Sequence, residues 1–380
     1  MTKFADVVTL NTSRIADPLA AGIERFVGLE HIDPDDLHIS SWGDVADGTT
    51  FTNHFKPGQV LFGKRRAYQR KVAVADFEGV CSGDIYVFES KDPDKLLPEL
   101  LPFICQSEGF YEYAVRTSAG SLSPRTNWKH LAEYEFPLPP IDEQRRITKL
   151  LQAVEEAINS HKRLEASSDN LNKSFLYRWL SVIDDKFEFD EVPHESSFYR
   201  IGDLTPCIVP GRTKPKAFTG TLPWVTIADI NSTILDSSQV EHKVSRDELN
   251  KVGGKIVPKD TVLLTCVGDL GVTSLTLGDV SFNQQIQAFK STEKIIPEYL
   301  VFALRAQKRQ MLSRAAQTTI PYLNKANCDA LVIPYPSKDV QVQIGNFLLR
   351  LEKTSKSVKK RIEALSLLKK QLFSEIFKNL

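Results

Sequence analysis

Two helical stretches of about 40 residues each constrain the fold of this 380-residue chain more than any other feature. Residues 141–180 follow the segment PLPP, contain neither Gly nor Pro, and carry apolar side chains at alternating spacings of four and three residues. This is a heptad pattern, and residues 338–380 repeat it. As helices, the stretches would each be roughly 60 Å long, so we expect their apolar stripes to pair. The predicted seam consists of Ile147, Leu151, Val154, Ile158, Ile344, Leu348, Leu351, Val358, Ile362 and Leu365.

The whole chain follows the same duplication. Residues 137–151 match residues 334–348 at an offset of 197, with prolines, an Asp, a Gln and two apolar residues in common. Upstream, FVGLEHID (26–33) corresponds to WVTIADIN (224–231) at an offset of 198, and KPGQVLF corresponds to VPKDTVLL at 201. The drift indicates short loop insertions. The sequence therefore predicts two copies of one module, each a globular domain followed by a long helix.

Each globular part mixes short apolar strands with helical segments. The predicted strands include QVLF, VAVADF and VCSGDIYVF in the first half, and TVLLTCV, VTSLTL and IQAF in the second. The predicted helical segments are residues 95–107 and 297–317. This mixture favours an α+β (mixed α/β) fold. We predict globular domains at 1–140 and 183–336 and long helices at 141–182 and 337–380.

Composition limits the kind of protein this chain can be. Lys+Arg and Asp+Glu both number 48, so any nucleic-acid surface must be a local patch. The five cysteines are scattered and never in C-x-x-C spacing, which disfavours a disulfide framework or a zinc site and fits a reducing compartment. The N-terminus lacks the apolar core of a signal peptide, and no apolar run approaches a membrane span. We expect a cytoplasmic protein.

Residues 56–71, KPGQVLFGKRRAYQRK, imitate a nucleotide-binding loop. Gly58, Gly63 and Lys64 satisfy G-x-x-x-x-G-K, but Arg65 replaces the Ser or Thr that would coordinate Mg²⁺. The interior QVLF reads as a buried strand rather than a phosphate-wrapping loop. The strand leads into five cations and a tyrosine within eight residues, a composition that suits phosphate and base contact. A solvated basic loop is the alternative.

Other loops carry cations in both halves. Ser123–Lys129 and its counterpart around Pro321 flank prolines, and residues 211–216 form a broken loop with three cations. Lys308 and Arg309 are expected to be solvated helix residues. Arg and Lys commonly read guanine, and Asn commonly reads adenine. The candidate DNA-binding residues are Lys64, Arg65, Arg66, Tyr68, Arg70, Lys71, Arg125, Asn127, Lys129, Arg212, Lys214, Lys216, Tyr322, Asn324 and Lys325.

Enzyme signals are weak. Asp76, Glu89 and Lys91 imitate the layout of a restriction-nuclease site, but Glu89 and Lys91 lie where a strand ends in a turn. No Asn-Pro-Pro-Tyr or Asp-Pro-Pro-Tyr segment is present to grip a flipped adenine, and no G-x-S-x-G or H-E-x-x-H motif occurs. The residues favour recognition over catalysis, with no metal site.

Several motifs carry a resemblance to a known family. They are VGLEHID, ISSWGD, QVLFGKRRAYQRKVAVADFEGVCSGDIYVF and SPRTNWKHLAEYEFPLPPIDEQRRI in the first half, and GRTKP, PWVTIADIN, SFNQQIQAF and VIPYPSKDVQVQI in the second. Over almost its whole length the chain resembles the DNA-specificity subunit of type I restriction–modification systems. Residues 337–341 depart from the family pattern because they lack the Glu that precedes Gln144, which leaves a different cap open for the second helix.

The resemblance implies a division of labour. Each globular part would be a target-recognition domain that reads one half of a bipartite DNA site, and the helices would pair as an antiparallel coiled-coil spacer. Two methyltransferase subunits using S-adenosylmethionine, and a motor–nuclease subunit using ATP and Mg²⁺, would be the partners. The chain itself would hold no cofactor and perform no chemistry. A stand-alone two-headed DNA-binding regulator and a nuclease centred on Asp76, Glu89 and Lys91 remain the alternatives.

Overall fold

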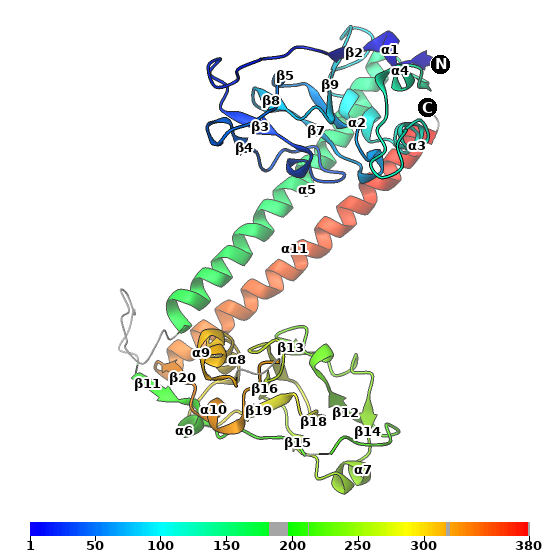
Figure 1. The fold of residues 1–380 in the computed structure, drawn as a ribbon. Helices are drawn as coiled ribbons and strands as arrows, with labels where there is room; N and C mark the ends of the chain where they lie inside the picture. The colour runs from blue at the N-terminus through cyan, green and yellow to red at the C-terminus, as the bar shows by residue number, and fades with distance from the viewer. Residues whose placement is uncertain (182–196, 212, 317–319, 379–380) are drawn as a thin grey trace. The chain divides into compact units, whose positions relative to one another are not determined.

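The structure, a computed structural model, describes residues 1–181, 197–211, 213–316 and 320–378. These residues form two compact units (Figure 1). Unit 1 contains Met1–His161 and Arg361–Leu380, and unit 2 contains Lys162–Lys360. None of the helices in the described part of the chain combines the length and the apolarity needed to cross a membrane.

Unit 1 is built on two four-stranded sheets and a small pair of strands. The first sheet has the order β2-β9-β6-β7, and the second has the order β4-β3-β8-β5. All neighbours in the first sheet are antiparallel, whereas β3 and β8 run parallel. The strands are β1 (Thr2–Lys3), β2 (Val8–Asn11), β3 (Arg25–Val27), β4 (Gly43–Asp44), β5 (Asn53–Phe55), β6 (Val60–Gly63), β7 (Val72–Val74), β8 (Gly79–Cys81), β9 (Ile85–Ser90) and β10 (Glu135–Phe136). The short helices are α1 (Phe4–Val7), α2 (Leu101–Gln106), α3 (Glu108–Arg116) and α4 (Trp128–Leu131).

Unit 2 also has two four-stranded sheets, which repeat those of unit 1 except at one edge, where β13 runs parallel to β17 while β2 of unit 1 runs antiparallel to β9. Their orders are β13-β17-β16-β19 and β14-β12-β18-β15, and β12 and β18 run parallel as β3 and β8 do. The strands are β11 (Ser197–Arg200), β12 (Leu222–Val225), β13 (Ile234–Leu235), β14 (Lys243–Val244), β15 (Ile256–Val257), β16 (Thr261–Thr265), β17 (Thr273–Thr276), β18 (Val280–Phe282), β19 (Ile286–Lys290) and β20 (Val332–Tyr335). The short helices are α6 (Ile201–Leu204), α7 (Arg246–Lys251), α8 (Pro297–Arg305), α9 (Lys308–Arg314) and α10 (Lys325–Asp329).

The central strand of each unit is buried on both faces. In β6, Val60 and Phe62 face the core that contains α2 and α3, and Leu61 faces the core shared with the second sheet. In β16, Val262 and Leu264 face the core that contains α8, and Leu263 faces the other core. Alternate residues point to opposite faces of a strand, so the apolar runs QVLF and TVLL reflect a sheet covered on both sides.

The turn before these strands corrects the sequence alignment by one residue. Gly58 (φ +85°) donates its backbone N–H to Ala75 O, and Asp260 (φ +62°) donates its own to Thr276 O. These two residues therefore occupy the same left-handed position, at an offset of 202. The alignment at 201 was wrong here because it matched prolines, whereas the left-handed backbone fixes the turn.

Three predicted segments are shorter or more divided than expected. The stretch 297–317 forms two helices, α8 and α9, which break at residues 306–307. The segment 95–107 becomes α-helical only at Leu101, after Pro98. VCSGDIYVF forms β8 and β9, which are separated by the Ser-Gly-Asp turn that ends at Asp84. In each case Pro, Gly or a short turn interrupts an apolar run that looked continuous.

The two long helices begin in the same way. Gln144 in α5 (Ile141–Phe175) donates from Nε2 to Pro139 O and accepts at Oε1 from the N–H of Leu97. Gln341 in α11 (Lys338–Lys378) donates to Pro336 O and accepts from the N–H of Ile296. Both amides are buried, with exposures of 1%. The missing Glu in the second copy therefore leaves this attachment of the helix to its domain unchanged.

Within each unit, segments of the long helices contact each other in antiparallel orientation. In unit 1, Lys369 Nζ lies 3.0 Å from the Glu155 carboxylate. In unit 2, Lys359 Nζ lies 3.4 Å from Glu165 Oε1. In unit 2, Ser355 Oγ also donates to Asp169 Oδ1 at 3.0 Å, so four residues forward along α5 correspond there to four residues backward along α11. The predicted seam residues are buried (Leu151, Val154, Ile158, Leu348, Val358) or half-buried (Ile147, Ile344, Leu351, Ile362, Leu365).

Candidate nucleic-acid interface

In unit 1, two loops that are distant in sequence lie side by side. Arg66 donates its backbone N–H to Pro124 O at 2.7 Å, and Thr126 donates its own to Lys64 O at 2.9 Å. Arg65 and Arg125 form an isolated β-bridge between the loops. We call residues 64–69 and 119–127 the two-loop platform. The structure therefore joins the basic segment and the Pro124 segment, which the sequence marked separately.

Asp84, which the sequence pattern did not single out, joins the cations of the two-loop platform. Arg125 Nε donates to Asp84 Oδ1 at 2.7 Å, and Arg65 Nη1 lies 3.4 Å from Asp84 Oδ2. The hydrogen bond from Arg125 is the main reason that the pKa of Asp84 lies below its ordinary value, and the charges of Arg125 and Arg65 add to it. One carboxylate therefore holds two guanidinium groups near each other.

The other cations of the basic loop, Lys64, Arg65 and Arg66, each contact a neighbouring side chain. Lys64 Nζ lies 4.7 Å from the centre of the Tyr86 ring, and burial lowers the pKa of this lysine. Arg65 and Arg66 both donate from Nη2 to Ser123 Oγ, at 3.0 and 3.2 Å. Tyr68 is 54% exposed on the 3₁₀ turn Ala67–Gln69. The side chain of Leu122, at the tip of the second loop, is 88% exposed.

Two of the five cations in residues 64–71 turn into the domain. Arg70 forms ion pairs with Asp35 at 2.7 Å and with Glu108 at 2.8 Å, and its guanidinium lies over the Tyr111 ring. Lys71 donates from Nζ to Leu29 O at 2.6 Å. Arg70 and Lys71, which the sequence marks as candidate DNA contacts, thus have acidic and carbonyl partners from distant segments of the same domain.

The two matching asparagines of the repeat cap helices. Asn127 Oδ1 accepts the N–H of Lys129 at the start of α4, and Asn324 Oδ1 accepts the N–H of Asn327 at the start of α10. N-caps commonly use Asn in this way. Lys129 is exposed, and Lys325 forms an ion pair with Asp329 at 2.9 Å. The repetition of Asn thus has a structural cause, which leaves the Nδ2 groups as the part that could read a base.

Unit 2 has the same loop pairing with different side chains. Leu323 donates its N–H to Cys266 O at 2.9 Å, and Gly268 donates its N–H to Pro321 O at 3.1 Å. Tyr322 bridges both Val267 and Ala316 and is 44% exposed. The segment that pairs with the proline loop, Cys266–Gly268, carries no cation.

Cations of unit 2 gather on the loop that enters β12. Lys214 is exposed and its Nζ lies 5.7 Å from the ring centres of Phe218 and Trp224. The exposed Lys216 donates its backbone N–H to Glu248 Oε1 at 2.7 Å. Arg212, another candidate, lies outside the described residues. A loop of cations beside aromatic rings can contact both phosphates and bases.

The three residues of the nuclease alternative come from two strand ends, and Glu89 has a partner outside this set. Glu89 Oε2 accepts a hydrogen bond from Gln59 Nε2 at 2.6 Å, and Glu89 and Lys91 flank the end of β9. Asp76 follows β7 in a separate turn. Within the described ranges, no group of three or more His, Cys, Asp or Glu side chains could hold a metal ion. The five cysteines are buried and free.

Residues 41–167 and 193–367 match the family model described as the type I restriction modification DNA specificity domain. A stretch of 163 residues is 31% identical to the type I restriction enzyme EcoDI specificity subunit of Escherichia coli. That match covers 38% of this chain and 34% of the relative, so it spans about a third of the relative's length.

Two solved structures share the fold. The type I restriction–modification S subunit from M. genitalium superimposes with a TM-score of 0.61 at 15% identity, covering 99% of this chain and 95% of that one. A chain from a study of complex assembly and conformational transition in a type I system gives a TM-score of 0.54 at 18% identity, covering 99% and 96%. At these identities the likeness extends to the fold.

Proposed function

Because the chain belongs to the family of type I restriction modification DNA specificity domains, we propose that it is a specificity subunit whose two globular domains each read one half of a bipartite DNA site. The family match carries this proposal, since it covers both repeats. The resemblance noted in the sequence is thereby confirmed at the level of the family. The stand-alone regulator and the nuclease have no comparable support.

The two-loop platform is the part of unit 1 that we propose to contact DNA. Lys64, Arg65, Arg66 and Arg125 concentrate positive charge in a chain without net charge, as a local phosphate-binding patch requires. Tyr68 supplies an exposed aromatic beside them. Most contacts that position a protein on DNA go to phosphates, whereas base edges give the sequence preference. We assign the arginines mainly to phosphates and the exposed tips to bases.

In unit 2, the paired loops present Tyr322 and Asn324, and the loop that enters β12 presents Lys214 and Lys216. Loop cations and exposed aromatics on a rigid sheet suit recognition, because loop residues change without disturbing the core. The two units offer different side chains at equivalent places. We therefore propose that they read different half-sites, so that the target is not palindromic.

The chain is proposed to act with partners that supply the chemistry. Two methyltransferase subunits would bind S-adenosylmethionine and methylate adenine, and a motor–nuclease subunit would use ATP and Mg²⁺. The family to which the chain belongs supports this assignment, and no cofactor is assigned to the chain itself. The helices α5 and α11 would set the gap between the half-sites and offer the docking surface for the methyltransferases.

A reconstitution experiment tests this proposal. The purified chain, incubated with DNA, S-adenosylmethionine, ATP and Mg²⁺, should neither methylate nor cut. Addition of the methyltransferase subunit of a type I system that binds this chain should produce N6-methyladenine at one bipartite sequence, mapped across a genome. Methyl transfer or cleavage by the isolated chain that disappears in Glu89→Ala would contradict the assignment.

A further inference from the structure

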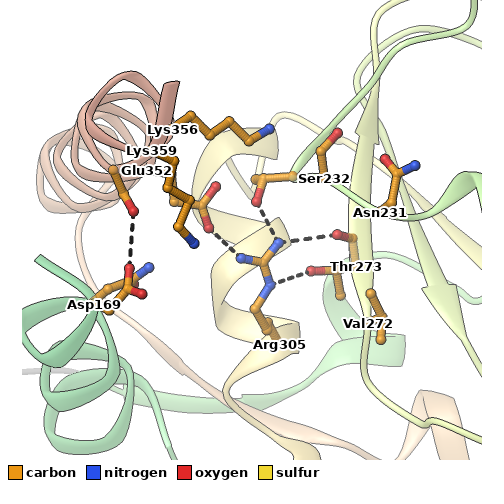
Figure 2. A pocket seen from close by; sticks show the side chains of 12 residues that line it. Asp169, Asn231, Ser232, Val272, Thr273, Arg305, Glu352, Lys356 and Lys359 are labelled. Atoms are coloured by element: carbon orange, nitrogen blue, oxygen red, sulfur yellow. Dashed lines mark hydrogen bonds and ion pairs between the residues drawn. The ribbon is translucent and has the colours of Figure 1, made fainter. Parts of the chain in front are cut away.

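Unit 2 contains a polar cleft of about 290 Å³ where its globular domain meets the long helices. Arg305 at the end of α8 lies at its centre, with Glu352 and Lys356 of α11 on one side and Thr273 of β17 on the other (Figure 2). Of the residues that line it, Val272 is the one apolar side chain. The full lining is Asp169, Asn172, Asn231, Ser232, Thr233, Val272, Thr273, Arg305, Glu352, Ser355, Lys356 and Lys359.

The guanidinium of Arg305 connects the domain to the helix. Nη1 donates to Glu352 Oε1 at 2.6 Å, and Nη2 donates to Thr233 Oγ1 at 2.6 Å. Thr273 accepts from Nε at Oγ1 and from Nη2 at its backbone oxygen, both at 3.1 Å. The side chains of Arg305 and Glu352 are 23% and 19% exposed. A charge-assisted hydrogen bond between partly desolvated groups is stronger than a surface pair and fixes geometry.

Unit 1 has an acid at the same place in the repeat. Glu155 precedes Glu352 by 197 residues, the offset of the long helices, and Asp35 precedes Thr233 by 198. Lys369 Nζ joins the first pair, since it contacts the Glu155 carboxylate at 3.0 Å and donates to Asp35 O at 3.2 Å. Glu155 and Lys369 are each 12% exposed. In both units, a helix glutamate is thus linked through one cation to the same loop of the globular domain.

The cation comes from opposite sides of this contact. In unit 1 it belongs to the helix, because Lys369 lies on α11, whereas in unit 2 it belongs to the domain. The repeat position that matches Lys369 is Asn172. Asn172 also stands opposite Glu352 in the helix register, seven residues forward from Glu165 and seven back from Lys359. Its Oδ1 is buried and has no hydrogen-bond partner among the described residues.

We propose that Arg305 and Glu352 are a positioning pair that seats the second recognition domain on the long helices, and that Lys369 and Glu155 seat the first. We call each of these contacts between domain and helix a seat. The inference rests on the proposed function: each seat fixes the position of the domain's DNA-reading loops, and hence the gap between the half-sites. The two seats use the same acid with the cation exchanged between domain and helix. The cleft in unit 2 is the space that a lysine at position 172 would fill.

This exchange makes the two domains specific for their own helix positions. At position 106, which matches Arg305 at the offset of 199 that relates Leu97 to Ile296, unit 1 carries the uncharged Gln106. A first domain placed on the second seat would leave Glu352 without its cation. A second domain placed on the first seat would bring Arg305 against Lys369. Like charges and unpaired, partly buried acids are unfavourable.

Three variants of the full chain test the seat. Arg305→Met keeps the aliphatic stem but removes the cation, and Arg305→Met with Asn172→Lys supplies the cation from the helix, as in unit 1. Lys356→Ala removes a cation that lines the same cleft without joining domain to helix, and is the matched control. Hydrogen exchange at residues 231–235 should become about tenfold faster in Arg305→Met, because the local opening becomes easier. The double variant should return close to the wild-type rate, and the control should not differ from it.

The second readout uses the chain in complex with its methyltransferase partner. Arg305→Met should broaden the preferred gap between half-sites in a randomised-gap library, with both half-site sequences kept, and Asn172→Lys should narrow it again. If hydrogen exchange at residues 231–235 is unchanged in Arg305→Met, while the amides of β16 stay protected, then Arg305 does not hold the domain on the helix. If hydrogen exchange becomes faster in Arg305→Met and Asn172→Lys does not slow it again, then a cation from the helix cannot replace the cation from the domain. If exchange behaves as expected and the complex shows no bipartite preference, the proposed function fails and the seat stands.

Discussion

Arg125 Nε donates a 2.7 Å hydrogen bond to Asp84 Oδ1, across 41 residues of sequence. The same carboxylate faces Arg65 at 3.4 Å. Two cations of the two-loop platform are therefore held together by an acid that lies in the turn between β8 and β9. The positive charge that we propose for DNA contact depends on a negative side chain for its placement.

Asp84→Asn should loosen the two-loop platform. We expect a loss of about 1 kcal/mol in the free energy of unfolding, because a pair that is partly exposed is screened by water. The pKa of Asp84 is lowered in the folded state, first by the Arg125 hydrogen bond. This contribution is thus complete above the ordinary carboxyl pKa of 3.8 and is lost as the pH falls below it.

The measurement is the thermal midpoint of unfolding between pH 6 and pH 2 for wild type and Asp84→Asn. The difference between the two should shrink as the pH falls below about 4. Asp142→Asn is the control, because Asp142 pairs with Arg145 on an exposed helix turn. A difference that stays constant down to the lowest pH would show that the carboxylate charge does not stabilise the platform.

The arginines of the basic loop should separate into two classes. Arg65→Ala and Arg66→Ala should weaken binding to matched and mismatched DNA alike, and should lower the slope of log K against log salt by up to about 0.9 for each phosphate that is no longer neutralised. Arg70→Ala should instead reduce stability, because it leaves Asp35 and Glu108 without their partner. Titrations at several salt concentrations measure both effects. A slope change in a folded Arg70→Ala variant as large as that in Arg65→Ala would refute this division.

The two helix entries should be equally sensitive to loss of their glutamine. Gln144→Ala and Gln341→Ala each remove a buried amide and leave the N–H of Leu97 or Ile296 without an acceptor. We expect each to cost about 1–3 kcal/mol of folding free energy. Denaturant unfolding, followed separately for the two units by hydrogen exchange, measures the loss. A large effect in one unit and none in the other would mean that the entries are not equivalent.

The sequence predicted those features that local pattern and duplication determine. The heptad spacing predicted α5 and α11, and the offset of 197 matched Gln144 with Gln341, whose hydrogen bonds prove to be equivalent. It failed where a partner comes from far along the chain. The sequence around Arg70 does not predict its contacts with Asp35 and Glu108, and the sequence around Arg125 does not predict its contact with Asp84. A basic run therefore looked uniformly exposed although some of its members are structural.

The role of a repeated residue was also ambiguous in sequence. Asn127 and Asn324 match across the repeat and looked like base-reading amides, yet both cap a helix. A cap and a base contact select the same residue type, and only the backbone geometry separates them. Arg305 went unnoticed because its meaning lies in the comparison of two three-dimensional contacts, Glu352 in one unit and Glu155 in the other.

We propose that the helices α5 and α11 set the distance between the two recognition domains. Seven residues inserted after His161 in α5 and seven inserted after Ile362 in α11 keep the heptad seam and lengthen the helices by roughly 10 Å. One turn of DNA, about 10 base pairs, spans roughly 34 Å. The preferred gap in a randomised-gap library should grow by about three base pairs while both half-site sequences stay the same. An unchanged preferred gap, in a variant that folds and still binds its methyltransferase partner, would contradict the account.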